Sequence, residues 1–299
     1  MYDVVVIGAG PAGITAAIYL KRANLNVAIL EKDAPGGLMN KTAFIENYPG
    51  EVKIGGADLA LKFFAQLTAL EVPYLYGEAK EVINNDDHKV IVTANEEIKT
   101  KRIVLAIGRR PRTLKDKNAE GLEGRGISFC AICDANLYKG EDVAIVGGGN
   151  SALEEALYLS EICNKVYIIH RSNELRGDKT LVPKVLGKEN IELIYFSEID
   201  KFVAEDGKLA SIDLLVHGEK ENIKVKACFV FIGYEPATEF LKNLDILDEK
   251  GYIIVNDKGE TPVKGIYAAG DAIRKDVYQI VTATGEGAIC AVSITKDLA

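Results

Sequence analysis

The sequence predicts an α/β protein with two similar domains, one inserted into the other. Residues 3–32 and 142–171 align without a gap and are identical at nine of thirty positions. Each copy holds an apolar run, a glycine-rich turn, a helical stretch and a second apolar run. This is the pattern of a strand–helix–strand unit in a buried parallel sheet. The length of 299 residues also fits two domains of roughly 150 residues each.

The glycine-rich turn of each copy predicts a site for a dinucleotide. Gly8 and Gly147 would make the tight turn after the strand, and Gly10 and Gly149 would let the backbone approach a diphosphate. The diphosphate would lie at a helix N-terminus, where free N–H groups and the helix dipole favour negative charge. We therefore predict two Rossmann-like dinucleotide-binding domains, the second inserted into the first.

The two copies differ at the end of their second strand. Copy one has Glu31, whose carboxylate can accept hydrogen bonds from a ribose 2′-OH. Copy two has His170 at the aligned position, followed by Arg171 and Arg176. This cationic cluster suits a 2′-phosphate, so copy two is predicted to bind NADP(H).

The remaining elements are assigned from apolar runs and periodicity. Leu59, Phe63, Leu67 and Leu70 share one face of a predicted helix over residues 58–70. Two similar runs, LAIGRRP and VFIGYEP, would carry the chain between domains, which places the first domain at 1–113 and 238–299 and the second at 114–237. The other predicted elements are short strands within 73–107, a helix over 179–187, strands near 191–196, 208–217, 228–232, 252–255 and 265–269, and a final helix.

Composition and charge exclude several classes of partner. The net charge is −8 and no run of like charges stands out, which argues against nucleic acid and against an anionic membrane. The uncharged stretch from Val4 to Leu20 is short for a membrane span and is interrupted by glycines. The N-terminus has no basic region and no cleavage site, so we expect a cytoplasmic protein.

Cys130 and Cys133 form the one close cysteine pair in the sequence, as Cys-Ala-Ile-Cys. Such a pair is usually redox-active or half of a zinc site in a reducing compartment. Zinc needs four ligands as a rule, and the sequence offers neither a second CxxC nor an HxxxH pair, so no metal is predicted. Cys163, Cys228 and Cys290 lie in apolar stretches, where inert buried thiols are usual.

Six motifs occur in the order typical of low-molecular-weight thioredoxin reductases, and the chain resembles that family over nearly its whole length. They are GAGPAG with Glu31, GGLMNKTAFIENYPG, CAICDA, GGGNSA, HRSNELR and GIYAAGDA. The resemblance implies FAD in the first domain, NADPH in the inserted one, thioredoxin or a thioredoxin-like protein as partner, and a homodimer. Electrons would pass from NADPH through FAD and the cysteine pair to a protein disulfide.

The same resemblance implies a role for individual residues. Cys133 would accept electrons from the flavin, Cys130 would attack the partner disulfide, and Asp134 would protonate the leaving thiolate. The implied FAD contacts are Gly8, Gly10, Pro11, Ala12, Glu31, Lys32, Gly37, Leu38, Asn47, Asp271, Gln279 and Ile280. The implied NADPH contacts are Gly147, Gly149, Asn150, Ser151, Ala152, His170, Arg171 and Arg176.

Three residues differ from the family pattern and keep alternatives open. Ser172 stands where a second arginine is common, Tyr278 where arginine precedes the glutamine, and Leu38 where glutamine is usual. NADH or reduced ferredoxin therefore stay possible electron donors. A ferredoxin–NADP reductase-like enzyme would not need the cysteine pair, and a nucleotide-sensing regulator would not need the full set of redox motifs.

Overall fold

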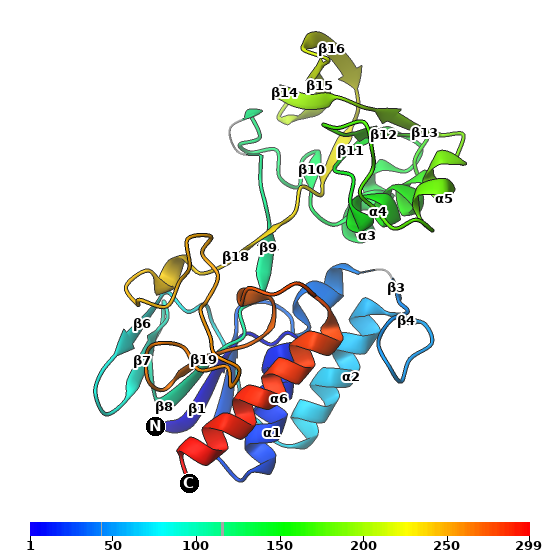
Figure 1. Cartoon of the computed structure of the whole chain (residues 1–299). Helices are drawn as coiled ribbons and strands as arrows, with labels where there is room; N and C mark the ends of the chain where they lie inside the picture. Colours follow the sequence, from blue (N-terminus) through cyan, green and yellow to red (C-terminus); the bar gives the residue numbers. More distant parts are fainter. Residues whose placement is uncertain (43, 115–116) are drawn as a thin grey trace. The chain divides into compact units, whose positions relative to one another are not determined.

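The computed structural model describes residues 1–42, 44–114 and 117–299, and it divides the chain into two compact units (Figure 1). Unit 1 contains Met1–Arg110 and Glu235–Ala299, and unit 2 contains Pro111–Tyr234. The boundaries predicted at 113/114 and 237/238 lie three residues further along the chain. The two crossings form the short strands β9 (Arg109–Pro111) and β18 (Tyr234–Pro236), which pair with each other.

Unit 1 is built on a mixed sheet whose centre is parallel. The strand order is β5-β2-β1-β8-β7-β6, and β19 pairs in parallel with the end of β8. The central strand β1 is buried on both faces of the sheet, which explains why its sequence is a continuous apolar run. The strands are β1 Tyr2–Ile7, β2 Val27–Glu31, β5 Tyr74–Tyr76, β6 Glu81–Asn84, β7 Lys89–Val92, β8 Glu97–Leu105 and β19 Ile266–Ala268.

Three helices lie side by side on one face of this sheet (Figure 1). They are α1 (Pro11–Arg22), α2 (Gly56–Ala69) and α6 (Ile280–Asp297). Val4 and Val6 of β1 pack against these helices, while Val5 packs into a second core on the other face. The shorter elements are η1 Gly37–Lys41, β3 Phe44–Ile45, β4 Ile54–Gly55, η4 Glu239–Leu241 and η5 Gly270–Ala272.

The uncharged stretch from Val4 to Leu20 is divided between β1 and α1. Across the described ranges, the structure contains no helix long and apolar enough to cross a membrane.

Unit 2 contains a parallel sheet in the order β10-β17-β11-β12-β13. One face is covered by helices, and the other packs against an antiparallel sheet of β14, β15 and β16. The parallel strands are β10 Ile127–Ser128, β11 Asp142–Val146, β12 Lys165–Ile169, β13 Ile191–Ile194 and β17 Ala227–Val230. The other elements are α3 Ala131–Asp134, η3 Ala135–Tyr138, α4 Asn150–Ser160, α5 Val182–Leu186, β14 Ser197–Glu205, β15 Lys208–Val216 and β16 Glu219–Lys224.

Three stretches of the predicted secondary structure are wrong, and one of them is β16, a six-residue strand that the sequence did not predict. β14 is a nine-residue strand that the sequence pattern did not predict. Ile199 of β14 is buried between two charged neighbours and Phe202 is buried next to Lys201, while Phe196, with φ of 50°, separates β14 from β13. The strand expected over 252–255 is absent from the described structure, where Ile253 forms only isolated bridges to Leu247 and Ile273.

The contact between α1 and α6 requires a residue without a side chain. A Cβ added to Gly287 would lie 2.2 Å from the carbonyl oxygen of Ala12, so the helices would have to separate. We expect Gly287→Ala to lower the free energy of unfolding by about 1–3 kcal/mol.

Gly285, on the exposed side of the same helix, is the matched control. A Cβ added there would meet no described atom within 4 Å, so Gly285→Ala should stabilise the protein by up to about 1 kcal/mol. Urea unfolding midpoints of both variants test the difference. Equal shifts would contradict the proposed contact.

Candidate functional site

The first glycine turn leaves its backbone open at one position. Gly8 has φ of 104°, and a Cβ there would lie 2.3 Å from the Ala106 carbonyl oxygen. Gly10 is the N-cap of α1, and a Cβ added there would meet no described atom within 4 Å. No described side chain caps α1, so its first N–H groups remain available to an anion.

Glu31 fixes the shape of this turn as well as ending β2. Its carboxylate accepts hydrogen bonds from the backbone N–H groups of Ala9 at 2.7 Å, Lys32 at 2.8 Å and Asp33 at 2.9 Å. Ala9 lies between Gly8 and Gly10, so the carboxylate ties the turn to the end of the second strand. The lone pairs that remain can accept from a ribose hydroxyl.

Other residues expected at a flavin come together from distant segments of unit 1. A Cβ on Gly37 would lie 3.5 Å from the Cα of Gly10. The Asn47 Nδ2 donates to the Gln279 Oε1 at 3.1 Å, across 232 positions of sequence. Gln279 is the N-cap of α6, and Ile280 packs against the small core around Met39.

Asp271 lies in η5, directly after β19, and is held by cations. It forms ion pairs with Arg109 at 3.0 Å and with Lys275 at 3.7 Å. Tyr278 stacks its ring over the Arg109 guanidinium at 3.6 Å. The tyrosine therefore supports the Arg109–Asp271 pair, whereas a cation at position 278 would add positive charge.

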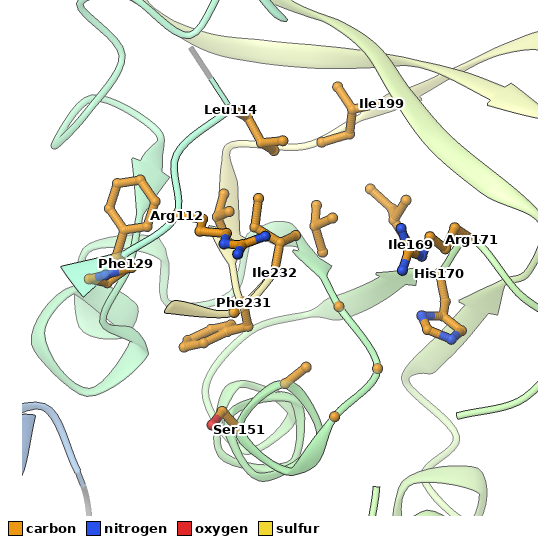
Figure 2. Close-up of a pocket in the computed structure, with 18 of the residues that line it drawn as sticks. Arg112, Leu114, Phe129, Ser151, Ile169, His170, Arg171, Ile199, Phe231 and Ile232 are labelled. Carbon is orange, nitrogen blue, oxygen red and sulfur yellow. The ribbon is translucent and has the colours of Figure 1, made fainter. Parts of the chain in front are cut away.

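The second glycine turn borders a cavity of about 820 Å³ in unit 2 (Figure 2). Gly149 is the N-cap of α4, and a Cβ on it would meet no described atom within 4 Å. No described side chain caps α4, as in α1. Of the following residues, Asn150 uses its Oδ1 to accept from the Asp178 N–H at 2.7 Å, Ser151 is exposed and Ala152 is buried in the core.

The sequence predicts a cationic cluster of His170, Arg171 and Arg176, but in the structure only the two arginines are exposed and His170 is buried. Its side chain is only 3% exposed and lies beneath the glycine turn, where a Cβ on Gly148 would be 2.4 Å from the imidazole Cε1. The Nε2 is 2.8 Å from the Ser172 Oγ and 3.0 Å from the Glu174 carbonyl oxygen. Ser172 therefore helps to hold the imidazole in place, and the ring supports the turn from below.

The cations that line the cavity come from two segments, and all of them except the half-buried Lys117 are exposed. Arg171 and Arg176 follow β12, as the sequence predicts. Arg112 and Lys117, from the segment that enters unit 2, also line the cavity, and Figure 2 shows the Arg112 side chain reaching into it. The sequence does not predict either residue as part of the site, because an isolated basic residue in a connection belongs to no motif.

Cys130 and Cys133 are joined by a disulfide, with Cα atoms 5.4 Å apart. The helix they open is the single turn α3, in which the Cys130 Sγ accepts the Cys133 N–H at 3.3 Å. Cys130 is only 6% exposed, whereas Cys133 lies at the surface. Asp134 Oδ2 accepts a hydrogen bond from the Ser128 Oγ at 2.7 Å.

The disulfide and the second glycine turn lie along one edge of the same sheet. Cys130 follows β10, Gly147 follows β11, and β17 pairs in parallel with both strands. Carboxyl ends of parallel strands share an edge, where ligands of open α/β sheets bind. Unit 2 thus combines a redox-active pair and a nucleotide-type turn without help from unit 1.

The other three cysteines are buried. Burial raises the pKa of Cys163 to about 11 and that of Cys290 to about 12, and it also raises the pKa of Cys228. Such thiols are poor nucleophiles at neutral pH. Across residues 1–42, 44–114 and 117–299, the structure has no group of three His, Cys, Asp or Glu that could hold a metal.

Comparison with known proteins agrees with this geometry. The family described as pyridine nucleotide-disulphide oxidoreductase matches residues 2–287. The chain belongs to this family. It is 40% identical to a thioredoxin reductase of Bacillus subtilis over 98% of this chain and 94% of the relative, and 38% identical to one from Listeria innocua over 99% and 93%. Members of the family use a flavin and a pyridine nucleotide.

Solved structures of the same type cover nearly the whole chain. The thioredoxin reductase of Lactococcus lactis matches with a TM-score of 0.95 and 38% identity, over 99% of this chain and 98% of that one. The thioredoxin reductase of T. acidophilum matches with a TM-score of 0.92 and 32% identity, over 99% of this chain and 98% of that one. A ferredoxin-flavin thioredoxin reductase from Clostridium acetobutylicum is 29% identical with a TM-score of 0.55, again over 99% and 98%.

Glu155 of α4 provides a pH-dependent test of unit 2. Burial and then the charge of Glu154 raise its pKa to about 7 from an ordinary value of 4.5, and its Oε2 has no hydrogen-bond partner among the described residues. Between these two pH values the folded protein keeps a proton that the unfolded chain has lost, so stability falls as pH rises through this window.

We expect Glu155→Gln to remove this fall, and its stability advantage over the wild type should grow by up to about 3 kcal/mol between pH 4 and pH 8. Urea unfolding at several pH values measures it. The exposed Glu205 is the control, since Glu205→Gln should follow the wild type. An advantage of Glu155→Gln that does not change with pH would contradict the argument.

Proposed function

We propose that the protein is an NADPH-dependent thioredoxin-disulfide reductase that uses FAD and the Cys130–Cys133 disulfide. The observation that carries the proposal is the disulfide on the sheet edge that also bears the second glycine turn. The relatives named thioredoxin reductase, which match over almost the whole chain, support thioredoxin or a thioredoxin-like protein as the substrate.

Unit 1 has the features that FAD would need. Gly10 offers open backbone for the diphosphate, and Glu31 offers a carboxylate for the adenosine ribose. Asp271, at the end of β19, and the linked pair Asn47–Gln279 would contact the rest of the cofactor. The same turn geometry recurs in unit 2, where Arg171 and Arg176 favour a 2′-phosphate and hence NADPH.

The protein's own contribution is to orient the reacting groups and to transfer protons. When bound, FAD would take a hydride equivalent from NADPH and deliver two electrons to the disulfide. Reduction of the disulfide gives two cysteine thiols, either of which can ionise to a thiolate. The Cys133 N–H is placed to stabilise a thiolate on Cys130. Asp134 would supply the proton for the thiolate that leaves the partner disulfide.

The proposal includes a homodimer in the cytoplasm. The outer face of α6 carries Val281, Ile289 and Val292, each close to half exposed, and Tyr19 of α1 is 48% exposed. Apolar side chains on neighbouring helices suit a subunit interface. The reducing environment of the cytoplasm suits a disulfide that must be opened and closed in each cycle.

One experiment tests both the function and the donor. The purified protein should be yellow, should bleach with NADPH, and should recover its colour when oxidised thioredoxin is added. NADH and reduced ferredoxin are tried in the same way. A protein that bleaches with ferredoxin but not with NADPH would identify a reductase of the ferredoxin type instead.

Arg171→Ala should reduce the preference for NADPH over NADH by about tenfold or more, since a charge-assisted contact to phosphate is worth roughly 1.5–3 kcal/mol. The ratio of kcat/KM for the two donors measures the preference. Arg125 is an exposed arginine of unit 2 away from the cavity lining, and Arg125→Ala should leave the ratio unchanged. Equal ratios in Arg171→Ala and the wild type would refute this role.

The two cysteines should not be equivalent toward thioredoxin. Cys133→Ser should form a stable mixed disulfide through Cys130 with a thioredoxin that lacks its resolving cysteine, because no neighbouring thiol remains to release it. Cys130→Ser should form none, although Cys133 is the more exposed cysteine in this structure, because the family resemblance places Cys133 against the flavin and assigns the attack to Cys130. Cys163→Ser serves as the buried-cysteine control. Mass spectrometry detects the adducts. Trapping through Cys133 alone would reverse the assignment.

A further inference from the structure

Ser128, the last residue of β10, is a buried hydroxyl between the disulfide and Asp134. Its side chain is 4% exposed. The Oγ lies 2.7 Å from the Asp134 Oδ2, 3.1 Å from the Cys130 backbone N and 3.2 Å from the Cys130 carbonyl oxygen. One hydroxyl thus has three polar neighbours but only one proton to donate.

The protonation state of Asp134 decides how this proton is used. When Asp134 is a carboxylate, the Ser128 hydroxyl donates to it and accepts from the Cys130 N–H, while the Cys130 carbonyl accepts the Asp134 N–H at 3.3 Å. When Asp134 is protonated, the acid donates to the Ser128 Oγ, and the hydroxyl turns to the Cys130 carbonyl. Both states satisfy every group, and no heavy atom has to move.

We propose that Ser128 is a positioning residue that lets Asp134 give up and regain its proton beside the cysteine pair. The inference rests on the proposed function, in which Asp134 is the acid. The Cys130 thiolate attacks the partner disulfide, and the thiolate that leaves takes the Asp134 proton. The Cys133 thiol then returns its proton to Asp134 and attacks Cys130, which releases the partner's second sulfur as a thiolate. The pair loses two electrons and the partner gains them.

Other titratable groups near α3 are less suited to this task. Tyr138 of η3 has its pKa raised, chiefly by burial and then by the charge of Asp134. Glu154 and Glu155 belong to α4, which packs on α3, and burial raises the pKa of both. Cys228 of β17 is a fully buried thiol. Among the described residues, Ser128 is the one that hydrogen-bonds to the Asp134 carboxyl.

Two disulfides with different leaving groups test the proposal. The holoprotein is reduced with dithiothreitol, desalted and mixed with either an aromatic disulfide, 5,5′-dithiobis(2-nitrobenzoate), or an alkyl disulfide, bis(2-hydroxyethyl) disulfide. The aromatic thiolate leaves without a proton, whereas the alkyl thiolate benefits from one. Ser128→Ala should slow the alkyl reaction by about tenfold or more, which is a part of what general acid catalysis typically contributes, and should leave the aromatic reaction unchanged.

Matched variants separate this role from a structural one. Asp134→Asn should show the same selectivity, and adding Ser128→Ala to it should cause no further loss. Ser128→Thr, which keeps the hydroxyl, should restore the alkyl rate. Ser160 is also a buried serine of unit 2 with a backbone partner, Leu157, and Ser160→Ala should behave as the wild type.

Equal slowing of both reactions by Ser128→Ala, or no slowing of either, would overturn the proposal. Additive losses in the double variant would overturn it too, because Ser128 would then act without Asp134. The readout needs neither thioredoxin nor NADPH. If the wild type shows no NADPH turnover with thioredoxin, but Ser128→Ala still slows only the alkyl reaction, the proposed function is refuted and the role of Ser128 stands.

Discussion

The geometry of both units depends on one constraint, which is that parallel strands end together at one edge of a sheet. In unit 1 this edge collects the ends of β1, β2, β8 and β19, and so places Gly8, Glu31 and Asp271 near one another. In unit 2 it collects the ends of β10, β11, β12 and β17. Residues that are far apart in sequence meet there because hydrogen bonds set the order and register of the strands.

Much of this arrangement was predictable, since the glycine turns and apolar runs depend on local sequence. The repeat at 3–32 and 142–171 corresponds to β1-α1-β2 and β11-α4-β12. The sequence did not predict β14, because Ile199 and Phe202 become core residues only when a second sheet packs over β11 and β17. The sequence did not predict Arg112 and Lys117 as site residues for a similar reason, because only the fold brings the segment after β9 to the cavity.

The two glycine turns also show how similar sequences can be supported in different ways. In unit 1 the Glu31 carboxylate accepts the Ala9 N–H and so holds the turn by a charge-assisted hydrogen bond. In unit 2 the imidazole of His170 packs beneath Gly148, and Ser172 bonds the ring. The aligned residues share a structural task. The sequence predicted only a ligand contact for Glu31 and for His170, because a side chain that supports a turn belongs to no motif.

Ser172 and Tyr278, which differ from the family pattern, have structural roles that explain how an arginine can be absent at each place. Ser172 bonds the buried His170, so Arg171 and Arg176 remain as the exposed cations after β12. Tyr278 covers the Arg109 guanidinium, which is paired with Asp271, and an arginine there would bring a second cation against the first. Substitution of Ser172 would therefore act on the second glycine turn through His170, and substitution of Tyr278 would act on Asp271 through Arg109.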